Sequence, residues 1–276
     1  MLLAAAPVGV VRLRRVRHRY RGTGWVLDGI DLRAEPGRPV VVTGTNGSGK
    51  STLLRIAAGV LTPSAGTVVG RPAVTGYLPT PFPTTRLTTR RLLGHLDAVH
   101  GLPRGCALAV LEALGFDDDA DAPVAGLSAG TRTKVGLAQA LAVRDGLVVL
   151  DEPWTALDDR AAAGLTALLA EPAARVVVLA DHSGRGSALP GAVVHRVERG
   201  RLLPGVVRPG RTRIEVSCGG PAGAVSAGLP GAATERCEGD VLVVTVEAPR
   251  ADRWLAAALA AGCSVVDVTR LPGGSG

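Results

Sequence analysis

A glycine-rich segment between an apolar run and a helical pattern carries the clearest chemistry in this sequence. It follows the β-branched residues Val40–Val42 and precedes a stretch whose apolar residues recur at helical spacing. The spacing matches GxxxxGK(S/T), in which glycines let backbone amides and a helix N-terminus wrap a phosphate. Lys50 would reach the terminal phosphate, and Ser51 would hold Mg²⁺. The predicted nucleotide-binding residues are Gly44, Thr45, Asn46, Gly47, Ser48, Gly49, Lys50, Ser51 and Thr52.

The alternative interpretation of this segment is a glycine-rich turn that binds nothing. The chain has 31 lysine and arginine residues, of which only Lys50 and Lys134 are lysines. A lysine at the one position where phosphate binding requires it therefore favours the nucleotide site.

Two acidic residues and a histidine follow other apolar runs that read as buried strands. Asp151 and Glu152 come directly after residues 147–150, and His182 follows residues 176–180. Ligands of open α/β sheets bind at the carboxyl ends of parallel strands. There Asp151 would orient the water shell of the metal, and Glu152 would take a proton from an attacking water. Alone, the acids equally fit a helix cap and an exposed carboxylate, and a lone histidine is more often structural; together with the phosphate loop they predict a catalytic site.

A further turn precedes the strand that bears the acids. Ser128 and Gly130 open an amphipathic helix, which leads through residues 147–150 to Asp151. At this point the sequence resembles the ATP-binding-cassette (ABC) ATPases, because residues 127–131, LSAGT, are similar to the LSGGQ signature of that family. Other matches are the segment 59–70, Tyr20 at the position of the aromatic residue that stacks on adenine, Asp158 in the loop between facing subunits, and His182 at the position of the switch histidine. The resemblance covers residues 10–204.

The resemblance implies a mechanism for these residues. Two cassettes dimerise head to tail, and each ATP lies between the phosphate loop of one subunit and the signature turn of the other. Ser128 and Gly130 would then bind the γ-phosphate across the interface, where Asp158 also lies. ATP and Mg²⁺ are the implied cofactors. Because one chain supplies one of each half-site, function requires a second copy or a similar cassette.

The segment 76–83, GYLPTPFP, departs from the family pattern. The family has a glutamine there that reaches the metal and the attacking water, whereas this chain has Thr80. Its hydroxyl could bind the metal through water, but it has a shorter reach and no amide donor. The only glutamine, Gln139, is expected to lie too far along the fold to substitute. We therefore predict a working but slowed ATPase.

The predicted fold class is α/β: a P-loop NTPase core of ABC type with antiparallel β and helical subdomains, plus a small C-terminal α+β domain. The cassette spans residues 1–205, and its helical subdomain, at about 84–145, is similar to the part of the family that grips a transmembrane subunit. Residues 206–276 read as strand, weak helix at 219–232, strand, strand, helix and strand, in the order of a ferredoxin-like domain. This domain resembles the C-terminal extensions of bacterial drug- and antibiotic-export cassettes, and a dimerisation or regulatory role is expected.

Composition limits the setting of the protein. No apolar run reaches the length of about 18 residues that a membrane-spanning helix needs, and the N-terminal segment lacks the order of a secretory signal. The net charge of +7 could indicate nucleic acid or anionic lipid as a partner. The arginines of residues 12–21 alternate with valine and leucine as in a half-buried strand, which favours a solvated arginine-rich surface over a polyanion site. An aromatic content of 3% further disfavours nucleic acid as a partner. The four cysteines are far apart, which predicts free thiols in a reducing cytosol.

Three functions fit these observations. The first is the ATP-binding and ATP-hydrolysing subunit of a membrane transporter, an exporter, that is bound at the inner face of the cell membrane to a separately encoded transmembrane subunit. The second is a soluble ABC protein that acts on ribosomes or nucleic acid, although the chain has neither a second cassette nor a long insertion. The third is a switch that binds ATP but barely hydrolyses it, because Thr80 replaces the glutamine.

Overall fold

The computed structural model describes residues 9–171, 174–205, 211–219 and 232–271. The chain divides into two compact units, Met1–Val206 and Val207–Gly276. The first unit contains every residue that the sequence predicts for the nucleotide site.

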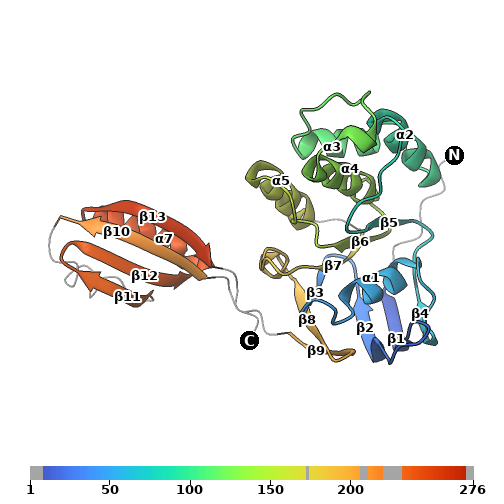
Figure 1. Cartoon of the computed structure of the whole chain (residues 1–276), viewed down its shortest axis with the longest axis horizontal. Helices are drawn as coiled ribbons and strands as arrows, with labels where there is room; N and C mark the ends of the chain where they lie inside the picture. Colours follow the sequence, from blue (N-terminus) through green and yellow to red (C-terminus); the bar gives the residue numbers. More distant parts are fainter. Residues whose placement is uncertain (1–8, 172–173, 206–210, 220–231, 272–276) are drawn as a thin grey trace. The chain divides into compact units, whose positions relative to one another are not determined.

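A six-stranded sheet forms the centre of the first unit, in the order β5-β6-β7-β3-β8-β9 (Figure 1). Its neighbours are parallel except β9, which is antiparallel to β8. The middle strands are buried because they carry apolar side chains on both faces. Because β6, β7 and β3 are parallel neighbours, their carboxyl ends lie at one edge of the sheet. The strands are β3 (Val40–Thr43), β5 (Thr75–Leu78), β6 (Leu147–Asp151), β7 (Val176–Ala180), β8 (Val193–Glu198) and β9 (Arg201–Pro204).

Helices cover both faces of this sheet. Helix α1 (Lys50–Ala58) packs in the same core as Val40 and Val42, whereas α4 (Ala129–Leu141) and α5 (Asp159–Ala170) pack with Val41. Alternate side chains of a strand point to opposite faces, so α1 lies on one face and α4 and α5 on the other. The predicted α/β core is confirmed.

A second sheet is antiparallel, as the sequence predicts. Its order is β2 (Leu27–Ala34), β1 (Val11–His18) and β4 (Ala65–Val69). Strands β1 and β2 precede the phosphate loop in the sequence, and β4 follows α1. The apolar residues of β1 alternate with arginines, and the apolar face joins the core around α1.

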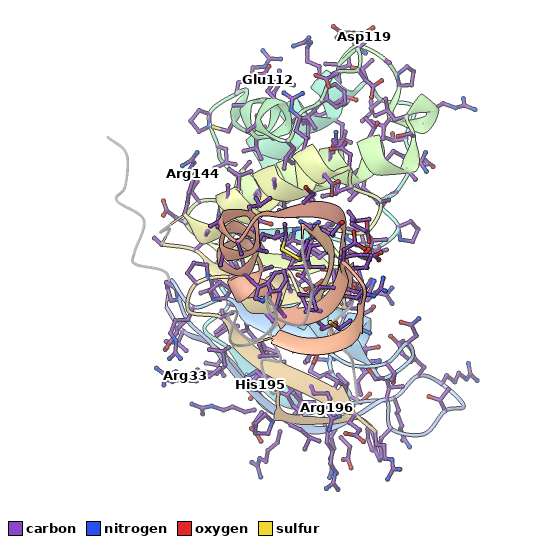
Figure 2. The ribbon with its side chains drawn as sticks, turned by 90° about the vertical axis from the view of Figure 1, so that its left-hand side faces the viewer. Arg33, Glu112, Asp119, Arg144, His195 and Arg196 are labelled. Carbon is purple, nitrogen blue, oxygen red and sulfur yellow. A yellow bond between two sulfur atoms is a disulfide. The ribbon has the colours of Figure 1, made fainter. Side chains whose placement is uncertain are left out.

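Several arginines of the first unit project into solvent, among them Arg33 on β2 and Arg196 on β8 (Figure 2). Arg33 pairs with Glu35 at 2.9 Å, and Arg196 pairs with Glu198 at 2.8 Å. Much of the basic surface is thus interspersed with acidic partners, which fits the solvated surface that composition favours.

Much of the segment 84–145, which the sequence predicts to be helical, is helical in the structure. Helices α2 (Thr89–Val99) and α3 (Cys106–Ala113) are followed by the 3₁₀ turn η1 (Val124–Gly126) and then by α4. Asp97 is only 1% exposed, and its carboxylate accepts hydrogen bonds from the amides of Gly105 (2.8 Å) and Ala107 (3.0 Å) at the start of α3. Across the residues that the structure describes, no helix is both long and apolar enough to cross a bilayer.

The second unit is a four-stranded antiparallel sheet with one described helix. The strand order is β11-β12-β10-β13, so the first and last strands of the unit are neighbours and the predicted ferredoxin-like order is present. Trp254 of the helix packs against the sheet in a separate apolar core. The weak helix predicted at 219–232 lies, except for its two end residues, outside the described part of the chain. The elements are β10 (Arg211–Cys218), β11 (Ala232–Glu238), β12 (Val241–Glu247), α7 (Ala248–Ala260) and β13 (Cys263–Leu271).

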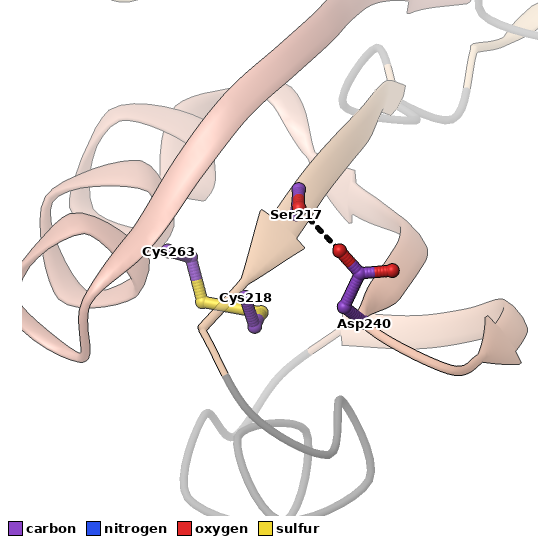
Figure 3. The surroundings of a disulfide bond; sticks show 4 residues. All are labelled: Ser217, Cys218, Asp240 and Cys263. Carbon is purple, nitrogen blue, oxygen red and sulfur yellow. Dashed lines mark hydrogen bonds between the residues drawn. A yellow bond between two sulfur atoms is a disulfide. The ribbon is translucent and has the colours of Figure 1, made fainter.

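A disulfide joins Cys218 on β10 to Cys263 on β13 (Figure 3). The expectation of four free thiols is therefore wrong for this pair, while Cys106 and Cys237 are free. The two cysteines are 45 residues apart, so their spacing in the sequence does not indicate a bond. They lie directly opposite each other only because β10 and β13 are neighbouring strands.

Candidate functional site

The phosphate loop joins the end of β3 to the start of α1, as the sequence predicts. Gly44 and Gly49 have φ angles of 142° and 109°, which favour glycine. A Cβ at Gly44 would lie 2.5 Å from the carbonyl oxygen of Val197, and one at Gly49 would lie 2.9 Å from the side chain of Leu27. The loop is pressed against β2 and β8, which fixes the path of its backbone amides.

The ammonium group of Lys50 lies over this loop. It donates hydrogen bonds to the carbonyl oxygens of Gly44 (2.8 Å) and Thr45 (3.2 Å), and it lies 3.9 Å from Oε1 of Glu152. The side chain is only 7% exposed. A cation is thus held between the loop and the acidic end of β6, where a phosphate of a bound nucleotide would need it.

Asp151 ends β6 and is 2% exposed. Its Oδ1 is buried and has no hydrogen-bond partner among the described residues. Burial raises the pKa of Asp151, and the hydroxyl of Ser51 opposes that rise. An unpartnered carboxylate oxygen beside a serine hydroxyl fits a hard cation such as Mg²⁺, which prefers oxygen ligands.

Glu152 and His182 are brought together from the ends of β6 and β7. His182 Nδ1 and Glu152 Oε2 are in direct hydrogen-bonding contact, which pairs the two residues that the sequence predicts to be catalytic. Glu152 has a φ of 52°, and its amide donates a 3.1 Å hydrogen bond to the carbonyl of Ala180. The backbone therefore turns sharply at Glu152, in the left-handed region.

Thr80 follows β5 and contacts the same strand end. Its hydroxyl donates a hydrogen bond to the carbonyl oxygen of Asp151. The side chain therefore binds the backbone of β6, and its role as a metal ligand stays a prediction.

Gln139 is closer to this loop than the sequence suggests. The expectation that it lies too far along the fold is wrong in one respect, because its Nε2 donates a 2.7 Å hydrogen bond to the carbonyl of Tyr77, three residues before Thr80. The described contacts include no bond from Gln139 to Asp151 or Glu152. It supports β5, and the expectation that it does not replace the missing glutamine stays a prediction.

Tyr20 lies next to the first turns of α1. Its hydroxyl is 3.1 Å from that of Thr52, its ring meets His18 edge-to-face at 4.9 Å, and 39% of the residue is exposed. It also lines a surface hollow of about 570 Å³ beside Arg19 and Ser64. An exposed aromatic face so close to the phosphate loop suits a nucleotide base. Trp25, another exposed aromatic residue, is flanked by the guanidinium groups of Arg17 and Arg19.

The signature turn lies at the start of α4. Ser128 caps the helix, its Oγ accepting a 3.1 Å hydrogen bond from the amide of Thr131. Gly130 packs on Ala156, which precedes Asp158, and Asp158 caps α5 through a 2.8 Å bond from the amide of Ala161. Among the described residues, no hydrogen bond or ion pair joins the signature turn to the phosphate loop of the same chain.

Sequence reasoning missed two residues that organise this region. Lys134 bonds to Asp158 at 2.8 Å, and Gln139 supports β5. The rarity of lysine in the chain was a signal for Lys134, whereas the contact of Gln139 depends on how α4 lies on β5.

A phosphate loop after one parallel strand, with an acidic pair and a histidine after two others, defines a P-loop nucleotide-binding protein. Residues 27–155 match the family described as ABC transporter. This part of the chain is similar to the ATP-binding domains of that family.

Curated relatives match the chain over a similar length. The zinc import ATP-binding protein ZnuC of Pseudomonas fluorescens (strain Pf0-1) is 38% identical over 161 residues, which make up 58% of this chain and 61% of the relative. ZnuC of Pseudomonas aeruginosa (strain UCBPP-PA14) is 38% identical over 150 residues, or 54% of this chain and 55% of the relative. The chain thus spans less than two thirds of the length of these relatives.

Solved structures share the fold. A dimeric ATP-binding cassette, MJ0796, in a post-hydrolysis state bound to ADP and Pi has a TM-score of 0.62 and 22% identity, over 72% of this chain and 99% of that one. The ATP-binding subunit of an ABC transporter also has a TM-score of 0.62, with 21% identity, over 70% and 88%.

Proposed function

We propose that this chain is the ATP-binding and ATP-hydrolysing subunit of a membrane transporter. The observation that carries the proposal is the convergence of Lys50, Asp151 and the Glu152–His182 pair at one edge of the central sheet. At this edge, a cation can bind a phosphate, a buried acid can bind a metal, and a carboxylate paired with a histidine can accept a proton.

Each residue of the site has a separate task in this proposal. The phosphate loop and Lys50 bind the phosphates, and Tyr20 stacks on the base. Ser51 and Asp151 would hold Mg²⁺, which when bound neutralises charge on the phosphates. Glu152 accepts the proton of the attacking water, and His182 holds the Glu152 carboxylate in place.

A second copy, or a similar cassette, completes the site. Ser128 and Gly130 of one chain would bind the γ-phosphate held by the other, and Asp158 would lie in the interface. The lack of a bond between the signature turn and the phosphate loop within the described residues of one chain supports this arrangement.

The transport role adds a separately encoded transmembrane subunit, which would bind the helical segment 84–145 and hold the chain at the inner face of the cell membrane. The relatives are zinc import proteins by name, so export stays a prediction that they do not support. Transport by the reconstituted pair in vesicles of known orientation decides the direction.

A slow ATP switch is the second candidate, because the Thr80 hydroxyl is bound to the backbone of Asp151. Action on ribosomes or nucleic acid has less support, since acidic residues pair with Arg17, Arg33 and Arg196 of the basic surface.

For residues 206–276 we propose a dimerisation or regulatory role; a chain without them that assembles and works normally would contradict it.

The central test is nucleotide binding and hydrolysis by the purified chain with Mg²⁺ and ATP. Lys50→Ala should weaken ATP binding by about 10- to 100-fold, because a charge-assisted contact is lost. Arg86→Ala removes an exposed cation outside the site and serves as the control. ATP uptake that Lys50→Ala leaves intact would reject the proposal.

A further inference from the structure

Lys134 connects three segments that are distant in the sequence. It lies in the second turn of α4, its Nζ is 2.8 Å from Oδ2 of Asp158, and it donates a 2.9 Å hydrogen bond to the carbonyl of Gly115 after α3. The Lys134 side chain is only 13% exposed. The ion pair and the amide of Ala161 together hold the pKa of Asp158 below its ordinary value.

Composition singles out this side chain. Lys50 and Lys134 are the only lysines in a chain of 276 residues. One binds the phosphate loop, and the other binds the loop that precedes α5.

A second contact joins the same two segments. A Cβ on Gly130 would lie 2.5 Å from the carbonyl oxygen of Ala156, so the signature turn packs directly on the loop 155–158. One contact is steric and lies at the turn itself. The other is ionic and lies one helical turn further along α4, so the loop is held at two points.

We propose that Lys134 is a positioning residue that fixes the Asp158 loop against the signature turn, so that both meet the facing subunit in one arrangement. The inference rests on the proposed function, because it needs an ATP-dependent dimer. Without the ion pair, the loop would keep its cap on α5 and its contact with Gly130, but it would lose its ionic contact with α4. Ordering the loop on dimerisation would then cost free energy, and the dimer would be weaker.

A purely structural role is the competing explanation, since the bond to Gly115 could simply stabilise the connection between α3 and α4. The two explanations differ in what Asp158 contributes. If Lys134 positions the loop, its effect disappears once the Asp158 charge is removed; if it only supports Gly115, its effect does not depend on Asp158.

The test is a double-mutant cycle on the ATP-dependent dimer, measured by analytical ultracentrifugation in the slowly hydrolysing Glu152→Gln background. Lys134→Met removes the cation, and Asp158→Asn removes the charge but keeps an oxygen that can cap α5. Each should weaken the dimer by about threefold to tenfold, and the double variant should be no weaker than either single one. Lys134→Arg should restore most of the affinity.

Two controls separate positioning from damage to the fold. Asp159→Asn removes the neighbouring acid, which Lys134 does not contact, and should leave the dimer unchanged. ATP binding to the monomer should be equal in all variants, because the phosphate loop is untouched. If Lys134→Met fails to fold, Asp158→Asn with and without Lys134→Arg still measures the ionic contribution.

Several results would overturn the assignment. Effects of the two substitutions that simply add, or an Asp158→Asn dimer as tight as the parent, would show that the ion pair does not position the loop. A parent chain that binds no ATP sinks the proposed function and this inference together. If the parent chain dimerises with ATP and the variants dimerise equally well, only the role of Lys134 is contradicted.

Discussion

The carbonyl oxygen of Ala156 lies 2.5 Å from the point where a Cβ on Gly130 would stand. Only a glycine leaves room for this contact, since the blocking atom belongs to the backbone and cannot rotate away. The signature turn and the loop before α5 therefore fit each other by shape.

Gly130→Ala should disrupt the signature turn and lower ATPase turnover by at least about tenfold, with unchanged ATP affinity of the monomer. Gly126→Ala is the matched control, because a Cβ at Gly126 meets no atom within 4 Å. Steady-state ATPase kinetics compare the two. Equal turnover in both variants would show that the contact with Ala156 does not matter for hydrolysis.

Glu152→Gln should lower turnover by about 10²- to 10⁴-fold and trap ATP in a stable dimer, because the amide cannot accept the proton of water. His182→Ala should also slow hydrolysis, with His95→Ala, exposed on α2, as its control. Turnover and dimer formation are measured together. A parent that hydrolyses no faster than Glu152→Gln would support the ATP switch over the transporter ATPase.

Asp151→Asn should raise the melting temperature of the nucleotide-free chain near neutral pH while abolishing the dependence of ATP binding on Mg²⁺. Burial raises the pKa of Asp151 above its unfolded value. The protonated acid therefore stabilises the fold below the unfolded pKa, and this contribution is lost as the pH rises through the folded pKa. The difference between variant and parent should shrink as the pH falls toward about 4. A difference that grows in acid would contradict this account.

Thr80→Gln should raise turnover by about tenfold, because it supplies the amide that can orient the attacking water. Thr80→Val is the control: it removes the hydrogen bond to Asp151 without adding an amide, and should cost about 1 kcal/mol of stability. Turnover of the glutamine variant at or below that of the parent would mean that Thr80 does not limit the rate.

Reduction of the disulfide, or Cys218→Ser with Cys263→Ser, should destabilise the second unit by about 4 kcal/mol, the chain-entropy value for a loop of this length. The bond closes a separation of 45 residues. Hydrogen exchange of β10 and β13 with and without reductant measures the change, and exchange in the first unit is the internal control. Identical protection of β10 under both conditions would count against the prediction.

The sequence predicts most of the first unit because its signals are local. The phosphate loop, the strand before Asp151 and the cap at Ser128 each depend on residues within a few positions. The α/β core and the antiparallel strands follow from the periodicity of apolar residues.

What the sequence leaves out depends on the packing of distant segments. The bond from Gln139 to Tyr77 requires α4 to lie on β5, and the Cys218–Cys263 bridge requires the first and last strands of the second unit to be neighbours. Neither arrangement has a signature in the spacing of the residues themselves.

The backbone of Glu152, the proposed proton acceptor, is left-handed, with a φ of 52°, and this conformation lowers the stability of the fold. A glycine there would relax about 1 kcal/mol of strain but would carry no carboxylate. Selection for stability alone would therefore replace Glu152, although the chemistry requires its carboxylate. A library of variants sorted only for heat resistance should be enriched in glycine at this position, and those survivors should bind ATP without hydrolysing it.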